Sequence, residues 1–157
     1  MFKIKIIVID RTRVSFLSEG ESLYMKRLKK YARVKWVEVK PMKITKGRSP
    51  VEILSEEGKK IERVLDKRDY LVSLDRSGHQ FDSPGLAGWL NKSSISSRGY
   101  ICFIIGGPLG LSRDILTQSD KVLSLSRLTL THEISRLLCL EQLYRSFTIL
   151  CGEKYHK

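Results

Sequence analysis

Cysteine is scarce in this sequence. Its three cysteines, Cys102, Cys139 and Cys151, are odd in number and form no CxxC pair. The sequence therefore predicts neither a disulfide framework nor a zinc ribbon. Because Cys102 and Cys139 stand within apolar segments, we expect both to be small residues of the core.

Long hydrophobic runs are also missing. The longest are IIVI and ICFII, far short of the roughly 20 apolar residues that a membrane helix needs. After the first two lysines the apolar run IIVI has only four residues, which is too short for the apolar region of a signal peptide. We therefore expect a cytoplasmic protein. The 157 residues are 41% hydrophobic and 29% charged, which excludes a disordered chain and a coiled coil. We therefore expect one globular domain over 1–157.

Acidic residues are few beside the basic ones. Lys and Arg total 29 and Asp and Glu total 17, which gives a formal net charge of +12. The excess lies almost wholly in residues 1–50, which hold 14 basic and 4 acidic residues. Such a segregated excess favours a polyanionic partner, most simply a nucleic acid. The alternative is a solvated basic surface on a protein with a high isoelectric point.

Hydrophobic periodicity and capping residues predict five strands that alternate with five helices. Strands are predicted at residues 2–9, 34–40, 70–74, 100–105 and 121–125. Helices are predicted at residues 18–32, 50–67, 83–92 and 132–149, with a short one after Ser112. Ser18 and Glu21 are expected to form a capping box, and residues 75–82 and 93–99 to be loops. The alternation predicts an α/β fold, a mostly parallel sheet flanked by helices.

The carboxyl ends of the strands are where such sheets bind ligands, which directs attention to the loops after Leu74, Ile105 and Leu125. The second of these is Gly-Gly-Pro-Leu-Gly (106–110), whose glycines let a ligand approach the backbone closely. It matches neither GxGxxG nor a P-loop, and its proline lacks the N–H that a phosphate cradle would use. The loop therefore suits a nucleoside-type ligand without a polyphosphate; a plain tight turn is the alternative.

His132 is predicted at the start of the last helix, where the helix dipole disfavours the cation and lowers the pKa. A neutral imidazole near a strand end suits a base or a hydrogen-bond partner, and a capping or packing role is the alternative. Arg136 and Arg145 follow on the same helix, nine residues apart and therefore on different faces. One of these arginines can have a structural role while the side chain of the other reaches a functional site.

Four segments together resemble a known family. They are Leu74-Asp75, FIIGGPLGL (103–111), LSLSRLTLTHEISRLLCLEQLYRSF (123–147) and the terminal YHK. In this order they are similar to the RlmH (YbeA-type) family of SPOUT-superfamily methyltransferases, which act on a pseudouridine in 23S ribosomal RNA. The combination is far more specific than any one segment, and the resemblance spans nearly the whole chain. It implies methylation of N3 of that pseudouridine, in the large subunit or the assembled ribosome.

The resemblance also implies an architecture and a cofactor site. The C-terminal part of the chain would form a deep trefoil knot, and a homodimer would bind S-adenosyl-L-methionine in the knot without a metal. The positions that match the family's cofactor residues are Leu74, Gly106, Gly107, Leu125, Ser126, Arg127, Leu128, Thr129 and Leu130. A side chain added at Gly106 would then fill the place of the adenosine.

The family's functional residues match His132, Arg145, Tyr155 and His156. In the family the tail of one subunit closes over the cofactor of the other, although a chain terminus taken by itself is expected to fray. His132 or His156 would accept the proton that leaves N3, and Arg145 would stabilise the negative charge on the ring carbonyls. Which histidine accepts the proton is left open by the sequence.

Three positions depart from the family's pattern. Lys157 stands where arginine is frequent, so a bidentate phosphate contact is lost. Thr131 replaces a proline before the histidine, which is expected to loosen the start of the last helix. Asp10 replaces a glycine after the first strand, so the shape of that loop is not predicted.

Two other functions are compatible with parts of the sequence. A non-catalytic RNA-binding module of the ribosome or its assembly would explain the charge, but it would have no use for the glycine loop or the His132 segment. A small Rossmann-type nucleotide enzyme would explain the alternation of elements, but GxGxxG is missing.

Overall fold

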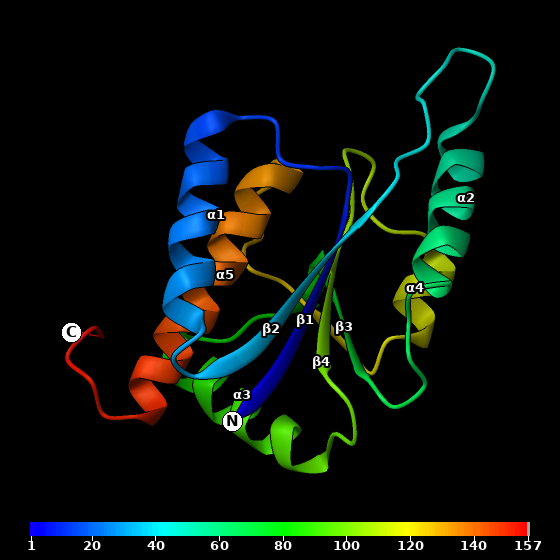
Figure 1. Cartoon of the computed structure of the whole chain (residues 1–157). Helices are drawn as coiled ribbons and strands as arrows, with labels where there is room; N and C mark the ends of the chain where they lie inside the picture. Colours follow the sequence, from blue (N-terminus) through cyan, green and yellow to red (C-terminus); the bar gives the residue numbers. More distant parts are fainter. Residues whose placement is uncertain (157) are drawn as a thin grey trace.

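The computed structural model describes residues 1–156, in which five strands alternate with five helices (Figure 1). The strands are β1 (Phe2–Ile9), β2 (Ala32–Val39), β3 (Tyr70–His79), β4 (Ile101–Ile105) and β5 (Lys121–Leu123). The helices are α1 (Ser15–Leu28), α2 (Pro50–Glu62), α3 (Ser83–Ser96), α4 (Arg113–Gln118) and α5 (His132–Leu150). The predicted order and type of the elements are confirmed.

The strands form one parallel sheet in the order β2-β1-β4-β3-β5. β4 is the central strand, and all of its residues are buried. β1 lies beside it in a register that pairs Ile4 with Ile101 and Val8 with Ile105. A continuous apolar run is what a strand needs when both faces of its sheet are covered. The predicted α/β fold with a parallel sheet is confirmed.

Helices cover both faces of the sheet (Figure 1). On one face α1, α3 and α5 pack together over a core that includes Phe147 and Cys139. On the other face α2 and α4 lie over a second core that includes Ile104 and Cys102. Cys102 and Cys139 are therefore buried core residues, as predicted.

The first helix begins and ends earlier than the predicted 18–32. The predicted capping box is wrong, because α1 begins before Ser18 and no side chain caps its first turn. The Glu21 carboxylate is buried and accepts a hydrogen bond from the Thr12 hydroxyl at 2.7 Å instead. The helix ends before Ala32, because that residue already pairs with β1 in the sheet.

Two segments predicted as loops are partly regular structure. β3 continues into 75–82, because His79 still pairs with Leu123 of β5 beyond a bulge. α3 continues into 93–99, where serine hydroxyls donate to carbonyl oxygens of the preceding turn and support another turn of helix. Strand pairing supports the first extension and serine hydrogen bonds support the second, and the local pattern of hydrophobicity predicts neither of them.

Two other elements are shorter than predicted. α2 begins at the predicted Ser49 cap, which forms a capping box, but it ends at Glu62 instead of 67. β5 ends at Leu123 instead of 125. The Ser124 hydroxyl donates to the Ser126 carbonyl oxygen at 2.9 Å and turns the chain out of the sheet.

The carboxyl ends of β4, β3 and β5 lie next to one another in the sheet. The fold therefore brings together the three loops that the sequence singled out. Within residues 1–156 no helix is long and apolar enough to cross a membrane. The trefoil knot that the resemblance implies stays a prediction.

Candidate active site

The glycine loop after β4 is a closed turn. Gly107 and Gly110 face each other in an antiparallel bridge, and the Gly110 N–H donates to the Gly107 carbonyl oxygen at 3.0 Å. Gly110 has a φ of 84°, in the left-handed region that favours glycine. A Cβ atom added to Gly106 would lie 2.3 Å from the Gly110 carbonyl oxygen. A side chain at Gly106 would therefore meet the backbone of its own loop, in addition to the ligand space that it is expected to fill.

A cavity of about 660 Å³ opens at this loop. Its walls come from the middle of β3, from the end of β4 and the glycine loop, and from the segment that leads from β5 into α5. The predicted cofactor positions that line it are Leu74, Gly106, Gly107, Leu125, Ser126, Leu128, Thr129 and Leu130. Eight of the nine predicted positions thus meet around one space, although they come from three separate parts of the sequence.

Arg127 is the predicted cofactor position that the cavity does not include. The Ser126 hydroxyl accepts a hydrogen bond from the Leu128 N–H at 3.0 Å, which makes a bend around Arg127. The bend leaves Arg127 exposed, and its side chain lines a neighbouring hollow beside the end of β3.

Several cavity residues were not among the predicted positions. They include Asp75, Arg76, Ile105, Leu109 and Ser135. Arg76 joins two walls, because its Nη1 donates to the Thr129 hydroxyl at 3.2 Å. Arg76 could have been identified from the sequence as a polar residue that closely follows the predicted end of a strand. Ser135 reaches the cavity because it lies one helical turn after His132, a spacing that could have identified it.

His132 lines the cavity from the start of α5. Thr131 before it is the N-cap, and its hydroxyl accepts a hydrogen bond from the Ile134 N–H at 3.3 Å. The expected loosening of this helix start is therefore wrong, because a hydrogen bond secures it. Burial and, after it, the positive charge of Arg136 lower the pKa of His132. The direction agrees with the sequence-based expectation, but burial is the larger cause.

Arg136 is the arginine of α5 that serves the structure. Its side chain is fully buried, and its guanidinium donates to the Ile9 carbonyl oxygen at 2.5 Å and to the Thr12 hydroxyl at 2.9 Å. The buried carboxylates of Glu21 and Glu133 offset the cost of burying its charge. Arg136 thereby ties the loop after β1 to the first turns of α5.

The loop after β1 has a left-handed residue that is not glycine. Asp10 has a φ of 67°. Aspartate tolerates this region because its short side chain can form hydrogen bonds locally. The Asp10 carboxylate accepts hydrogen bonds from the Arg11 N–H at 2.9 Å and from the Arg13 guanidinium at 2.9 and 3.1 Å. Asp10 thus adopts a conformation for which glycine is the usual residue.

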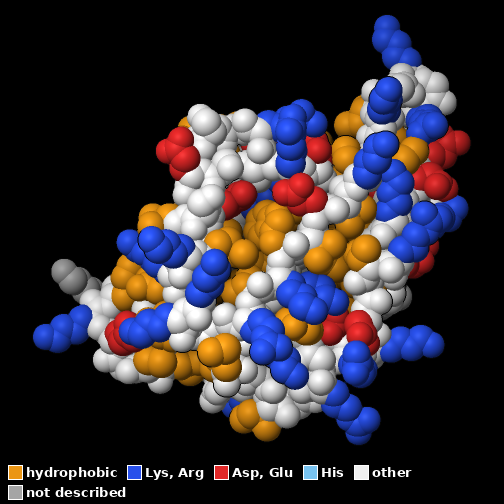
Figure 2. All heavy atoms as spheres, in the orientation of Figure 1, with side chains coloured by type: hydrophobic (Ala, Val, Ile, Leu, Met, Phe, Trp, Pro, Cys, Tyr) orange, Lys and Arg blue, Asp and Glu red, His pale blue; other side chains and the backbone are white. Residues whose placement is uncertain are grey.

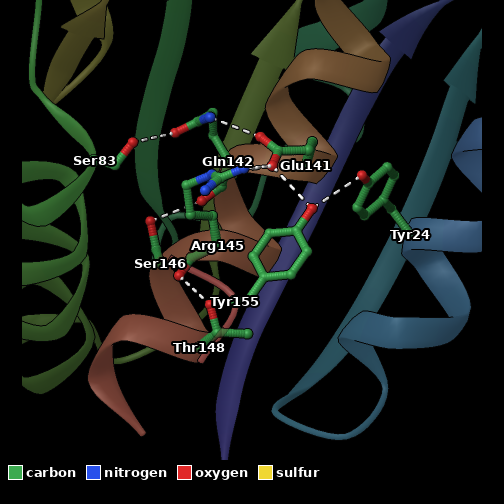
Figure 3. A network of polar contacts seen from close by, with 8 residues as sticks. All are labelled: Tyr24, Ser83, Glu141, Gln142, Arg145, Ser146, Thr148 and Tyr155. Carbon is green, nitrogen blue, oxygen red and sulfur yellow. Dashed lines mark hydrogen bonds and ion pairs between the residues drawn. The ribbon is translucent and has the colours of Figure 1, made fainter. Parts of the chain in front are cut away.

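Arg145 and Tyr155 meet near the other end of α5 (Figure 3). The Arg145 guanidinium donates twice to one oxygen of Glu141, and the Tyr155 hydroxyl donates to the same oxygen at 3.2 Å. His132 precedes Arg145 by 13 residues, which is about 20 Å along a helix. The predicted functional residues therefore fall into two groups within one chain, with His132 at the cavity and Arg145 away from it.

The C-terminal tail is held against α1 and α5. The Tyr155 ring lies 4.8 Å from the Tyr144 ring, and the Tyr155 hydroxyl lies 3.2 Å from that of Tyr24. These contacts hold the tail in place as far as Tyr155. His156 is exposed, and Lys157 lies outside the described residues.

A family of predicted SPOUT methyltransferases matches this chain over residues 2–156. The chain belongs to the SPOUT methyltransferase family. It is 41% identical over 160 residues to the ribosomal RNA large subunit methyltransferase H of Moorella thermoacetica, with 100% of both chains covered. Proteins of the same name from Symbiobacterium thermophilum and Carboxydothermus hydrogenoformans are 37% and 35% identical, with 99% of each chain covered. The family resemblance found in the sequence motifs is confirmed.

The basic segment between β2 and α2 projects from the body of this SPOUT methyltransferase (Figure 1). Its cations are Lys40, Lys43, Lys46 and Arg48, and all are exposed. Figure 2 shows Lys and Arg side chains gathered along this projection. An exposed run of cations that stands out from the surface favours contact with phosphates.

A second, smaller hollow of about 230 Å³ lies at the opposite end of the sheet, beside Phe2, Gly99 and Ile101. Parallel sheets bind ligands at the carboxyl ends of their strands, so the larger cavity is the candidate site of the methyltransferase. Within residues 1–156 no group of three or more His, Cys, Asp or Glu residues is placed to hold a metal ion.

Proposed function

We propose that this SPOUT methyltransferase transfers a methyl group from S-adenosyl-L-methionine to N3 of a pseudouridine in 23S ribosomal RNA. The observation that carries the proposal is the cavity, where the glycine loop, the segment 125–130 and His132 surround one space at the strand ends. The relatives named ribosomal RNA large subunit methyltransferase H support the choice of an RNA substrate. Such a substrate, in the large subunit or the assembled ribosome, belongs to the cytoplasm.

The cavity suits S-adenosyl-L-methionine in size and chemistry. Its volume of about 660 Å³ falls within the roughly 300–1,000 Å³ of small-molecule sites. The residues that would hold the donor are Leu74, Gly106, Gly107 and the segment 125–130, of which Arg127 faces the neighbouring hollow. Leucine side chains offer apolar walls, and glycine backbone and hydroxyl groups offer hydrogen bonds. When bound, S-adenosyl-L-methionine supplies a sulfonium methyl group that is already activated for transfer.

The residues of the chain then have three tasks. The cavity walls position the two reactants and exclude water. His132, whose pKa is lowered, is neutral and accepts the proton from N3, with His156 as the alternative acceptor. Arg145 stabilises the negative charge that develops on the ring carbonyl oxygens.

A homodimer would unite the two groups of predicted functional residues. Within one chain, Arg145 lies about 20 Å along α5 from His132, too far to act on the same base. We therefore place the tail of one subunit over the cavity of the other. Exposed apolar side chains on α1 and α5 support this arrangement, because a partner would cover them: Phe16, Leu23, Ile134 and Leu138.

The acid limb of the pH–activity profile should lie below pH 6.5. Neutral His132 accepts the proton, and its neutral fraction rises as the pH rises through its pKa. Because the pKa of His132 is lowered from 6.5, more than half of His132 is neutral at pH 6.5, so the midpoint of the acid limb should lie below that pH. Single-turnover methyl transfer measures the profile, and His132→Gln should lose the limb. A limb at or above pH 6.5 would contradict the role given to His132.

The projecting cations should set the salt dependence of RNA binding. Each phosphate that a cation neutralises releases counterions, so affinity falls steeply as salt rises. Replacing Lys40, Lys43, Lys46 and Arg48 by serine should reduce the slope of log affinity against log salt by up to about 3. Filter binding of an rRNA fragment measures the slope, and donor affinity should stay as in the wild type. An unchanged slope would mean that these residues are only a solvated surface.

Calorimetric titration tests the donor site. We expect saturable binding of S-adenosyl-L-methionine and of its demethylated product, and no binding of ATP or NAD, whose polyphosphates the glycine loop does not cradle. Binding of NAD or ATP instead would favour a nucleotide enzyme. Binding of RNA without any binding of the donor would favour a non-catalytic RNA module.

A further inference from the structure

Both carboxylate oxygens of Glu141 are engaged by neighbouring side chains (Figure 3). Oε1 accepts hydrogen bonds from Nε and Nη2 of Arg145, at 3.0 and 2.6 Å, and from the Tyr155 hydroxyl at 3.2 Å. Oε2 accepts a hydrogen bond from Nε2 of Gln142 at 2.6 Å. The side chains of Glu141 and Arg145 are 16% and 26% exposed, so water screens this pair less than an ion pair on the open surface.

The network around Glu141 is anchored on two other helices. On one side, Oε1 of Gln142 accepts a hydrogen bond at 2.9 Å from the hydroxyl of Ser83, at the start of α3. On the other side, the Tyr155 hydroxyl lies 3.2 Å from the Tyr24 hydroxyl of α1. Figure 3 shows Glu141 between these two branches. A carboxylate held from several sides fixes the orientation of the guanidinium that it binds.

The guanidinium of Arg145 keeps one nitrogen free. Its hydrogen bonds go to a single oxygen of Glu141, and within residues 1–156 Nη1 makes none. The Tyr155 ring lies against it, with 4.7 Å between the Arg145 Cζ and the ring centroid. The hydrogen bonds to Glu141 raise the pKa of Arg145, so the guanidinium stays charged while the carboxylate balances its charge. Its free donor suits a carbonyl oxygen better than a phosphate, because a phosphate would also meet the negative charge of Glu141.

We propose that Glu141 is a positioning residue for methyl transfer, which aims the free donor of Arg145 at a carbonyl oxygen of the target base and holds Tyr155 against it. This inference rests on the proposed function, in which Arg145 and Tyr155 act at the cavity of the partner subunit. Glu141 itself does not touch the RNA. By balancing the charge of Arg145, it also keeps that residue from acting as a phosphate anchor.

A purely structural role would make Glu141 no more than a tether for the tail. The chain offers a matched comparison in Glu153, which also ties the tail to the region of α1. Its carboxylate accepts hydrogen bonds from Nζ of Lys30 at 2.7 Å and from the Tyr31 hydroxyl at 2.8 Å. Glu153→Gln therefore removes the same charge and the same kind of tether, one cation and one tyrosine, without touching Arg145.

The first test compares the turnover of Glu141→Gln and Glu153→Gln in the full-length protein. The assay uses ribosomes that lack the modification and methyl-labelled S-adenosyl-L-methionine. We expect kcat of Glu141→Gln to fall about 10- to 100-fold, because a misplaced guanidinium loses its alignment with the base. The kcat of Glu153→Gln should stay within about twofold of the wild type, because this variant leaves the pair of Glu141 and Arg145 in place and a surface substitution changes stability little. The KM for the donor and the melting temperature should be similar in both variants.

Salt dependence and a double variant separate positioning from tethering. In Glu141→Gln the unbalanced charge of Arg145 should steepen the salt dependence of RNA binding by about one unit, because one more phosphate can be neutralised. Arg145→Gln should lower kcat at least as much as Glu141→Gln does. The double variant should be no slower than Arg145→Gln alone, because Glu141 acts through Arg145.

Three outcomes would overturn the positioning role of Glu141. They are a wild-type kcat in Glu141→Gln, equal losses in the two glutamate variants, and a double variant whose loss is the product of the two single losses. Absence of methyl transfer by the wild-type protein would instead overturn the proposed function, and the positioning role with it.

Discussion

Gly106→Ala should weaken the binding of S-adenosyl-L-methionine by roughly 100-fold, which corresponds to backbone strain of about 3 kcal/mol. The added Cβ would lie 2.3 Å from the carbonyl oxygen of Gly110 and 2.4 Å from its carbonyl carbon. The turn has to open to relieve this contact, and it forms one wall of the cavity. Calorimetry measures the Kd, and circular dichroism measures the melting temperature.

Gly88→Ala is the matched control for this substitution. Gly88 lies within α3, and a Cβ there has no heavy atom within 4 Å. Alanine is favoured over glycine in a helix by about 1 kcal/mol, so this variant should bind the donor like the wild type and unfold no earlier. If Gly106→Ala bound S-adenosyl-L-methionine with wild-type affinity, this result would contradict the proposal that the glycine loop forms a wall of the donor site.

Deletion of residues 155–157 should reduce methyl transfer by about 100-fold or more, because it removes groups that act on the reacting base. The fold and the dimer should persist, because three residues bury little surface and the deletion removes only a few contacts of Tyr155 within its own chain. They are the hydroxyl contacts with Tyr24 and Glu141 and the packing against the Tyr144 ring. Gel filtration and the melting temperature check the fold, and labelled methyl transfer to ribosomes measures the loss.

Mixed dimers of this truncation with Gly106→Ala make the test sharper. In such a dimer the truncated subunit has a cavity with an intact glycine loop, and the Gly106→Ala subunit supplies an intact tail to that cavity. Two affinity tags allow the mixed species to be purified away from both parents. We expect it to regain activity that neither parent has. No recovery in purified mixed dimers would mean that each subunit builds its site alone.

The place of the cavity could be predicted because it follows from the periodicity of the chain. Apolar strands that alternate with capped helices imply a parallel sheet, and the loops at its strand ends then converge. Leu74 stands at the predicted end of the third strand, Gly106 follows β4 and Leu125 lies beyond β5, and all three line the cavity. The position of His132 at a helix start was likewise visible, since the following residues have helical periodicity.

The contacts that orient the site could not be predicted, because they join residues remote in the sequence. Arg136 binds the Ile9 carbonyl oxygen across 127 positions, and no local pattern encodes that distance. The failed capping box has the same origin, since the hydrogen bond from Thr12 and the charge of Arg136 engage Glu21 instead. Local sequence correctly identified a helix here, while tertiary contacts decided where it begins.

The two arginines of α5 show both what the sequence can predict and what it cannot. Helical spacing predicted that Arg136 and Arg145 lie on different faces, and their surroundings differ: Arg136 is fully buried, whereas the Arg145 side chain is 26% exposed. Which of them is buried was not visible, because α5 packs against both α1 and α3 and carries apolar residues on several sides. The partner of Arg145 stands four residues before it, a spacing typical of helical ion pairs, so Glu141 could have been identified from the sequence.

The most direct test of the proposed function is nucleoside analysis of 23S ribosomal RNA after the reaction. Ribosomes that lack the modification are incubated with the purified protein and methyl-labelled S-adenosyl-L-methionine, and the RNA is digested and analysed by mass spectrometry. We expect the label in a single nucleoside, N3-methylpseudouridine, and a strongly reduced signal with His132→Gln. Label in a different nucleoside, or none from a protein that binds the donor, would contradict the proposed function.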